Sequence, residues 1–230
     1  MTNERKVIDQ MAEALGARPT KVIELYQSWS QAISTWPPSI QLQASQLVGI
    51  AYRLESDYPA AINAFENALM FADLLEDTVK VSAILRDQAM VYLKMAELEP
   101  GSKGSENYFQ SAYKCLEESL RLLENEGADD EYYATKGFIG RYYLSVGDKE
   151  SARRQFSSCD QYFKERSHNK NYQLNNLMLL FSITFWPIRW KFMPRLVMLT
   201  VKTGQRRRLP QIVALAIGGK RLEEKARRFR

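Results

Sequence analysis

The sequence contains very little histidine and cysteine: one histidine, His168, and two cysteines, Cys115 and Cys159, in 230 residues. Because these ligands are few and far apart in the chain, they do not form a zinc centre, and we expect no metal site and no cofactor. His168 stands in a polar break without the positioned partner that general acid–base catalysis needs. The two cysteines are typical of buried free thiols in a reducing compartment.

Glycine and proline are also scarce, with 11 and 8 residues, and they lie between segments of helical periodicity. Gly101 and Gly104 are not followed by the Lys-Ser/Thr pair of a phosphate-binding loop. The first residues, MTNERKVIDQ, are polar, so we expect no signal peptide. Arg189, Lys191 and Arg195 interrupt the apolar run in the C-terminal part, which is therefore not a conventional membrane span. These absences predict a cytoplasmic protein that is not an enzyme.

Residues 47–72 contain two short helical patterns separated by a polar turn. The first runs from Val48 to Tyr52 and includes Gly49, which costs roughly 1 kcal/mol relative to alanine inside a helix. We therefore expect a second helix to cross close to Gly49, with the small side chain of Ala61 opposite it. The helical stripe of the second pattern consists of Ala61, Ile62, Phe65, Ala68 and Leu69.

This arrangement resembles the tetratricopeptide repeat (TPR), which spans about 34 residues and reads L-G-x-x-Y, a turn, and A-x-x-x-F-x-x-A. The residues at the family's positions are Val48, Gly49, Tyr52, Tyr58, Ala61, Phe65 and Ala68. A second copy contains Ile139, Gly140, Tyr143, Gly147, Ala152, Phe156 and Cys159. A weaker copy between them contains Ala89, Tyr92, Ala112, Leu116, Ser119 and Leu120, with a loop insertion expected from Leu98 to Asn107.

The resemblance implies an all-α fold, namely an α-solenoid of antiparallel helix pairs. We expect a TPR-like domain over residues 1–170, with an N-terminal helix pair in 1–38 and three repeats in 39–166. The expected bounds of the repeats are 39–72, 78–124 and 130–166, and the second N-terminal helix is expected from Pro19 to Thr35. Residues 171–230 are expected to add a helix that covers the last repeat, followed by a basic, aromatic extension.

The resemblance also implies a binding groove lined by the first helix of each repeat. Its exposed positions are expected to be Gln43, Gln46, Ile50, Arg53, Arg86, Met90, Lys94, Arg141 and Ser145. One arginine from each repeat then faces one surface, where guanidinium groups suit the carboxylates of an acidic or C-terminal peptide. The alternative is that these are solvated charges neutralised by nearby Asp and Glu. The family's Lys and Asn carboxylate clamp is not reproduced, because Gln46 and Ile50 stand at its positions, and this disfavours a chaperone-tail adaptor.

Positive charge is concentrated in residues 186–230, which contain 13 Lys or Arg and 2 Glu, a net charge of +11, whereas the remaining residues carry −6. This tail has three interpretations. It binds an anionic membrane, with Trp186 and Trp190 at the interface and Arg206, Arg207 and Arg208 on headgroups. It binds nucleic acid through phosphates. Or it folds back onto the acidic helices or docks into a partner. The aromatic residues favour a membrane over nucleic acid.

We therefore expect a non-catalytic TPR adaptor or scaffold that binds a protein or peptide partner in the assembly or regulation of a complex. The first alternative is a peripheral membrane protein that uses the basic tail on anionic lipid. The second alternative is a nucleic-acid-associated regulator with a TPR sensing domain.

Overall fold

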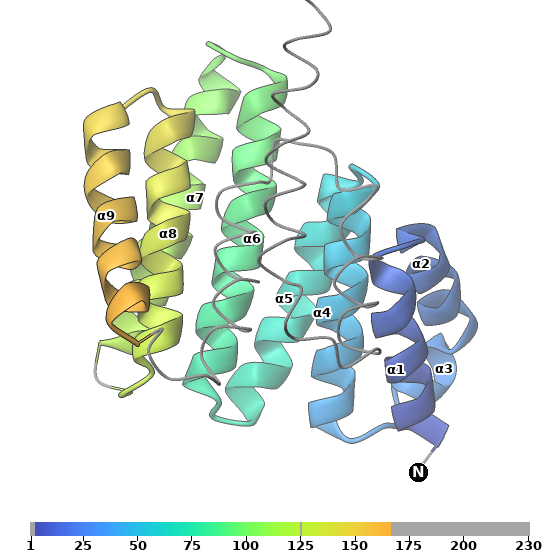
Figure 1. The fold of residues 1–230 in the computed structure, drawn as a ribbon. Coiled ribbons are helices and arrows are strands. Elements are labelled where there is room, and N and C mark those ends of the chain that lie inside the picture. Colours follow the sequence, from blue (N-terminus) through green and yellow to red (C-terminus); the bar gives the residue numbers. More distant parts are fainter. Residues whose placement is uncertain (1–2, 125, 167–230) are drawn as a thin grey trace, which may run out of the picture. The chain divides into compact units, whose positions relative to one another are not determined.

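The structure, a computed structural model, describes residues 3–124 and 126–166, and all regular structure in these residues is helical (Figure 1). The helices of this part are α1 (Asn3–Leu15), α2 (Pro19–Ser28), α3 (Ser30–Ile33), α4 (Pro38–Leu54), α5 (Tyr58–Leu74), α6 (Thr78–Leu98), α7 (Lys103–Leu123), α8 (Asp129–Ser145) and α9 (Lys149–Arg166). None of them combines the length and the apolar content that crossing a membrane requires. The all-α prediction is therefore confirmed for the described residues.

The predicted tail contacts, Trp186, Trp190, Arg206, Arg207 and Arg208, lie outside the described residues, as does the helix expected to cover the last repeat. All interpretations of the basic tail therefore stay predictions.

The second N-terminal helix is shorter than expected. Instead of continuing from Pro19 to Thr35, α2 ends at Ser28, and Trp29 has φ −103° and ψ 5° before the short helix α3. The interruption brings the ring of Trp29 to 6.3 Å from the ring of Trp36, and both residues belong to the N-terminal core. Aromatic packing therefore ends this helix earlier than its apolar periodicity predicts.

The helices begin where the sequence supplies capping side chains. The Asp57 carboxylate accepts a hydrogen bond from the Ala60 amide at the start of α5, over 3.2 Å. Asp77 caps α6 in the same way through the Lys80 amide, over 2.9 Å. Each cap satisfies a backbone donor that has no partner inside its helix, so these polar turns fix the start of the following helix.

The loop expected from Leu98 to Asn107 is present but shorter than predicted, because it covers only residues 99–102. Helix α6 continues to Leu98 and α7 begins at Lys103, so the extra residues lengthen both helices to 21 residues, against 17 in α4 and α5. The Ser102 hydroxyl caps α7 by accepting from the Ser105 amide over 2.9 Å, and the Ser105 hydroxyl donates to the Ala96 carbonyl over 3.0 Å. These bonds hold the start of α7 against the end of α6 and stabilise the added turns.

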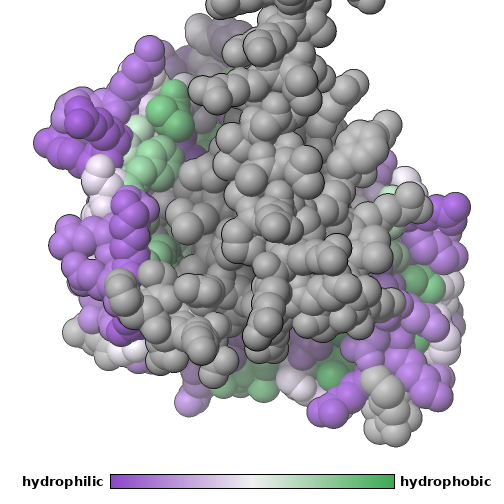
Figure 2. All heavy atoms as spheres, viewed as in Figure 1, coloured by the Kyte–Doolittle hydropathy of each residue, from purple (hydrophilic) through white to green (hydrophobic). Residues whose placement is uncertain are grey.

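Each helix from α4 to α9 packs against its neighbour in the chain, and α6 also contacts α4 and α8. The buried side chains form successive cores, the largest fully buried ones including Met11, Phe65, Ile84 and Leu116. The surface visible in Figure 2 is mostly hydrophilic where the structure describes it, with smaller hydrophobic areas. The apolar stripes of the sequence thus face inward and position polar residues of α4, α6 and α8 near one another.

The two repeat glycines lie at close helix contacts. A Cβ atom added to Gly49 would come within 2.8 Å of the Phe65 ring, and one added to Gly140 within 2.8 Å of the Phe156 ring. Both glycines therefore leave room for a phenylalanine of the following helix. The close crossing is confirmed, but Phe65, not Ala61, supplies the nearest side-chain atoms to Gly49.

Candidate partner-binding surface

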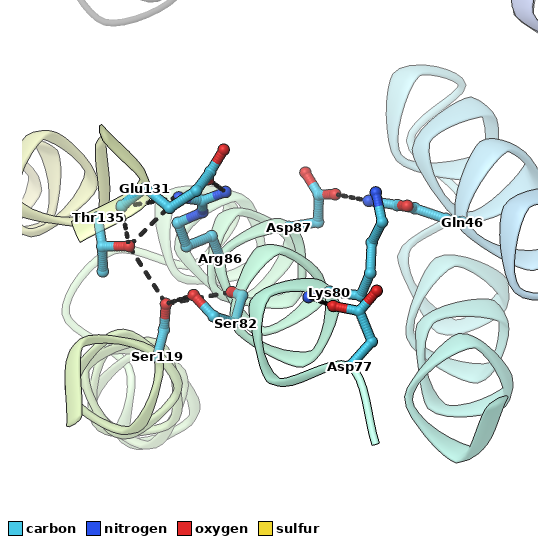
Figure 3. A network of polar contacts seen from close by, with 9 residues as sticks. All are labelled: Gln46, Asp77, Lys80, Ser82, Arg86, Asp87, Ser119, Glu131 and Thr135. Atoms are coloured by element: carbon cyan, nitrogen blue, oxygen red, sulfur yellow. Dashed lines mark hydrogen bonds and ion pairs between the residues drawn. The ribbon is translucent and has the colours of Figure 1, made fainter. Parts of the chain in front are cut away.

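The predicted groove residues come from one face each of α4, α6 and α8, and hydrogen bonds connect these helices. The Gln46 amide nitrogen on α4 donates to the Asp87 carboxylate on α6 over 3.2 Å (Figure 3). At the other end of α6, the Ser145 hydroxyl of α8 donates to the Glu97 carboxylate over 3.4 Å. The structure thus brings the three helices side by side, and we name the surface they share the α4–α6–α8 face.

Exposure varies along this face. Gln43 is exposed, whereas the half-buried residues are Gln46, Ile50, Arg53, Lys94, Arg141 and Ser145. Ile50 packs against the core below α4. The Lys94 ammonium forms an ion pair with Glu97 one turn along α6, over 2.5 Å. The polar and charged residues of α4 and α8 on this face are therefore partly exposed.

Arg86 does not lie on the accessible surface, so its expected exposure is wrong. Its relative exposure is 9%, and its guanidinium donates to the Glu131 carbonyl over 3.0 Å and to the Thr135 hydroxyl over 3.3 Å. It also forms an ion pair with the Glu131 carboxylate of α8 (Figure 3). Helix α8 covers this position because α6 and α8 pack together. Arg86 therefore joins two helices and does not present its charge to a partner.

Met90 is also buried, with a relative exposure of 3%, and the expectation of an exposed position is wrong for it as well. It lies in the core shared by α6, α7 and α8, together with Leu93, Leu116 and Ile139. The reason is its place on α6, one turn after Arg86, where the neighbouring helices close over the same face.

A chain of buried hydroxyl groups continues the Arg86 contact, and the sequence did not reveal it. Ser82 and Ser119, both fully buried, have their hydroxyl oxygens 2.9 Å apart, and Ser119 lies 3.3 Å from the Thr135 hydroxyl (Figure 3). The Ser119 hydroxyl also contacts the Ser82 carbonyl over 3.1 Å. These bonds satisfy polar groups that are costly to bury alone, and they connect α6, α7 and α8.

Asp87 on α6 adds a negative charge to the α4–α6–α8 face, and the predicted set of groove residues did not include it. Arg86 and Asp87 are successive residues, which a helix turns about 100° apart, so one faces α8 and the other faces α4. Burial raises the pKa of Asp87, while the positive charge of Arg53 and the hydrogen bond from Gln46 act in the opposite direction. Burial lowers the pKa of Arg53, and Asp87 opposes that shift. The two side chains therefore stabilise each other's charged form.

Arg141 is electrostatically coupled to Arg53. Burial, and after it the positive charge of Arg53, lowers the pKa of Arg141 to about 10, while Glu97 acts in the opposite direction. Arg141 remains protonated at pH 7, since its pKa lies well above that value. Arg53 and Arg141 thus both contribute positive charge to the α4–α6–α8 face, where Asp87 and Glu97 favour their protonated forms.

Comparison with protein-family models and with curated proteins finds no match for this chain. The TPR resemblance therefore rests on the sequence motifs alone. Any proposal about function rests on the geometry of the described helices.

Proposed function

We propose that the protein is a non-catalytic adaptor built as a TPR-like solenoid of antiparallel helix pairs, and that it binds an acidic protein or peptide segment on the α4–α6–α8 face. Three features support the repeat: the short turns between successive helices, the contacts of α6 with both α4 and α8, and the equivalent Gly49–Phe65 and Gly140–Phe156 approaches. An adaptor in the assembly or regulation of a complex needs such a rigid, extended face.

The observation that carries the binding proposal is the placement of α4, α6 and α8 side by side by the Gln46–Asp87 and Glu97–Ser145 hydrogen bonds, which brings Arg53 and Arg141 to one face. The charge of Arg53 contributes to lowering the pKa of Arg141, so the two guanidinium groups act on the same region of space. A carboxylate placed between them reduces their repulsion and accepts charge-assisted hydrogen bonds, each worth about 1.5–3 kcal/mol. An acidic segment fits this face better than a neutral or basic one.

A peptide titration of the intact chain tests the proposal. The probe is a fluorescent, glutamate-rich peptide with a free C-terminal carboxylate, and fluorescence anisotropy reports its binding. Replacing both arginines, Arg53→Gln with Arg141→Gln, is expected to weaken binding at least about tenfold. Arg153→Gln with Arg154→Gln is the matched control, since it removes the same charge from exposed positions on α9 and leaves the affinity nearly unchanged. Equal affinity of the wild type and the Arg53/Arg141 variant contradicts the proposal.

A further inference from the structure

Exposed apolar side chains gather at the carboxyl end of α5. Met70, Leu74 and Leu75 have relative exposures of 56%, 66% and 41%. Met70 and Leu74 lie four residues apart on α5 and therefore share one side of the helix, and Leu75 follows at its end. Each of these side chains leaves apolar surface in water that a partner could bury.

Two exposed carboxylates are neighbours of this apolar patch in the sequence. Asp73 and Glu76 are exposed neighbours of Leu74 and Leu75, and Glu76 has φ 54° in the turn between α5 and α6. The last carbonyl groups of α5 add negative partial charge at the same place. A cationic group near the patch is therefore stabilised, whereas an anionic group is repelled.

The turn between α7 and α8 lies at the same edge and adds further exposed carboxylates, Glu124 and Glu126. The Ser82–Ser119 and Ser119–Thr135 contacts hold the beginning of α6, the end of α7 and the beginning of α8 together. In Figure 1 both turns lie along the lower edge of the helices, and Figure 2 shows hydrophobic and hydrophilic atoms side by side there. We name the patch and these carboxylates the Leu74 edge.

We propose that the Leu74 edge is a docking site for a basic amphipathic helix of a partner protein. The apolar stripe of such a helix buries Met70, Leu74 and Leu75, and its lysines or arginines meet the carboxylates of Asp73, Glu76 and the α7–α8 turn. This edge prefers the opposite charge to the α4–α6–α8 face. The proposal does not depend on the acidic partner of that face and makes the protein an adaptor with two different docking surfaces.

The test uses the intact chain and two designed helical peptides with the same leucine stripe, one with lysine and one with uncharged glutamine at the polar positions. We expect the leucine–lysine peptide to bind more tightly. The chain carries a formal net charge of +5, but residues 1–185 carry −6, so a preference for lysine indicates an acidic surface and the variants below locate it. Isothermal titration calorimetry measures both affinities.

Two variants locate the binding. Leu74→Ser with Leu75→Ser is expected to lower the affinity for the leucine–lysine peptide about tenfold, because the variant loses anchor side chains of the interface. The control, Leu98→Ser with Leu144→Ser, removes leucines that are 67% and 52% exposed at the ends of α6 and α8, and it leaves the affinity unchanged. Thermal unfolding confirms that both variants fold.

Three results would overturn the proposal. The first is equal binding of the lysine and glutamine peptides, and the second is wild-type affinity in the Leu74/Leu75 variant. The third is absence of binding to the lysine peptide together with self-association in sedimentation equilibrium that Leu74→Ser abolishes. That result would assign the Leu74 edge to a second copy of the chain.

Discussion

The two helices of a pair make their close contact through different residues in the outer pairs, α4–α5 and α8–α9, than in the middle pair, α6–α7. In both outer pairs a glycine, Gly49 or Gly140, leaves room for a phenylalanine ring. At the corresponding positions of the predicted frame the middle pair has Ala89 and Leu116, both fully buried in one core. A larger residue on the first helix accompanies a smaller one on the second. The comparison teaches that, in the proposed repeat frame, the combined volume at the helix contact is similar while the residues change.

The arginines of the three pairs also differ. Arg53 and Arg141 of the outer pairs are half-buried and electrostatically coupled, whereas Arg86 of the middle pair is buried against α8. The middle pair has longer helices and a buried polar network, and its arginine contributes to the contact with the next pair. The same residue type thus belongs to the proposed binding face in two pairs and joins two helices in the third.

The largest effect is expected from Gly140→Leu, which tests the glycine–phenylalanine contact. The added side chain overlaps the Phe156 ring, so we expect a loss of about 3 kcal/mol, or about 6–12 °C in Tm. Gly104→Leu is the control, because a Cβ there approaches only the Glu99 and Ser102 side chains, at 3.4 and 3.5 Å. An unchanged melting temperature in the Gly140 variant would show that the assigned frame is wrong.

A smaller loss is expected from Arg86→Met, which tests the role of the middle arginine. The change leaves the Glu131 carbonyl without its guanidinium donor, and we expect about 1–3 kcal/mol in urea unfolding. The ion pair itself adds little, because the Glu131 side chain is 39% exposed. The exposed Arg153→Met on α9 should stay within about 0.5 kcal/mol of the wild type. Equal stability of the two variants would show that Arg86 does not stabilise the fold.

The next variants place the alanine and leucine combination of the middle pair into the last pair, α8–α9. Gly140→Ala crowds the Phe156 ring, Phe156→Leu leaves a space, and the double variant reproduces the Ala89 and Leu116 combination. We expect the double variant to lose about 1 kcal/mol less in free energy of unfolding than the sum of the losses of the two single variants. Additive single effects in urea unfolding would mean that the two positions do not share one volume.

The smallest effect concerns Cys159, which occupies the frame position of the buried Ser119. Its thiol donates to the Tyr133 carbonyl over 3.1 Å, and burial raises its pKa to about 11, with Lys136 opposing. Since only the thiolate reacts, alkylation of a Cys115→Ser variant should accelerate about tenfold per pH unit between pH 8 and 10. A rate that levels off near pH 8.5 would indicate an ordinary, accessible thiol.

The sequence predicts the helices well where a turn residue stops one pattern and a capping residue starts the next, as at Asp57 before α5 and Asp77 before α6. The close helix contact expected at Gly49 is confirmed as well, because glycine inside a helix favours a close neighbour. The prediction is only partly right at Leu98–Asn107, where Pro and Gly do lie in a loop but the loop is limited to residues 99–102 because the flanking residues continue both helices.

The candidate surface was less predictable than the fold. Helical spacing places Arg86 and Met90 on the same face as Lys94, but it does not say how far α8 covers that face. The buried serines carry no sequence signal of their own, because a hydroxyl at a small-residue position is compatible with a core or with solvent. Partners such as Asp87 emerge only when the helices are placed together, since they connect residues about forty positions apart.

The most direct test compares the arginines of the outer and middle pairs in one binding experiment. The glutamate-rich peptide is titrated against the wild type, Arg53→Gln with Arg141→Gln, and Arg86→Gln, at a temperature where thermal unfolding shows all three to be folded. We predict that the double variant loses at least about tenfold in affinity, whereas Arg86→Gln binds like the wild type and melts at a lower temperature. Loss of binding in Arg86→Gln with full binding in the double variant would contradict the account.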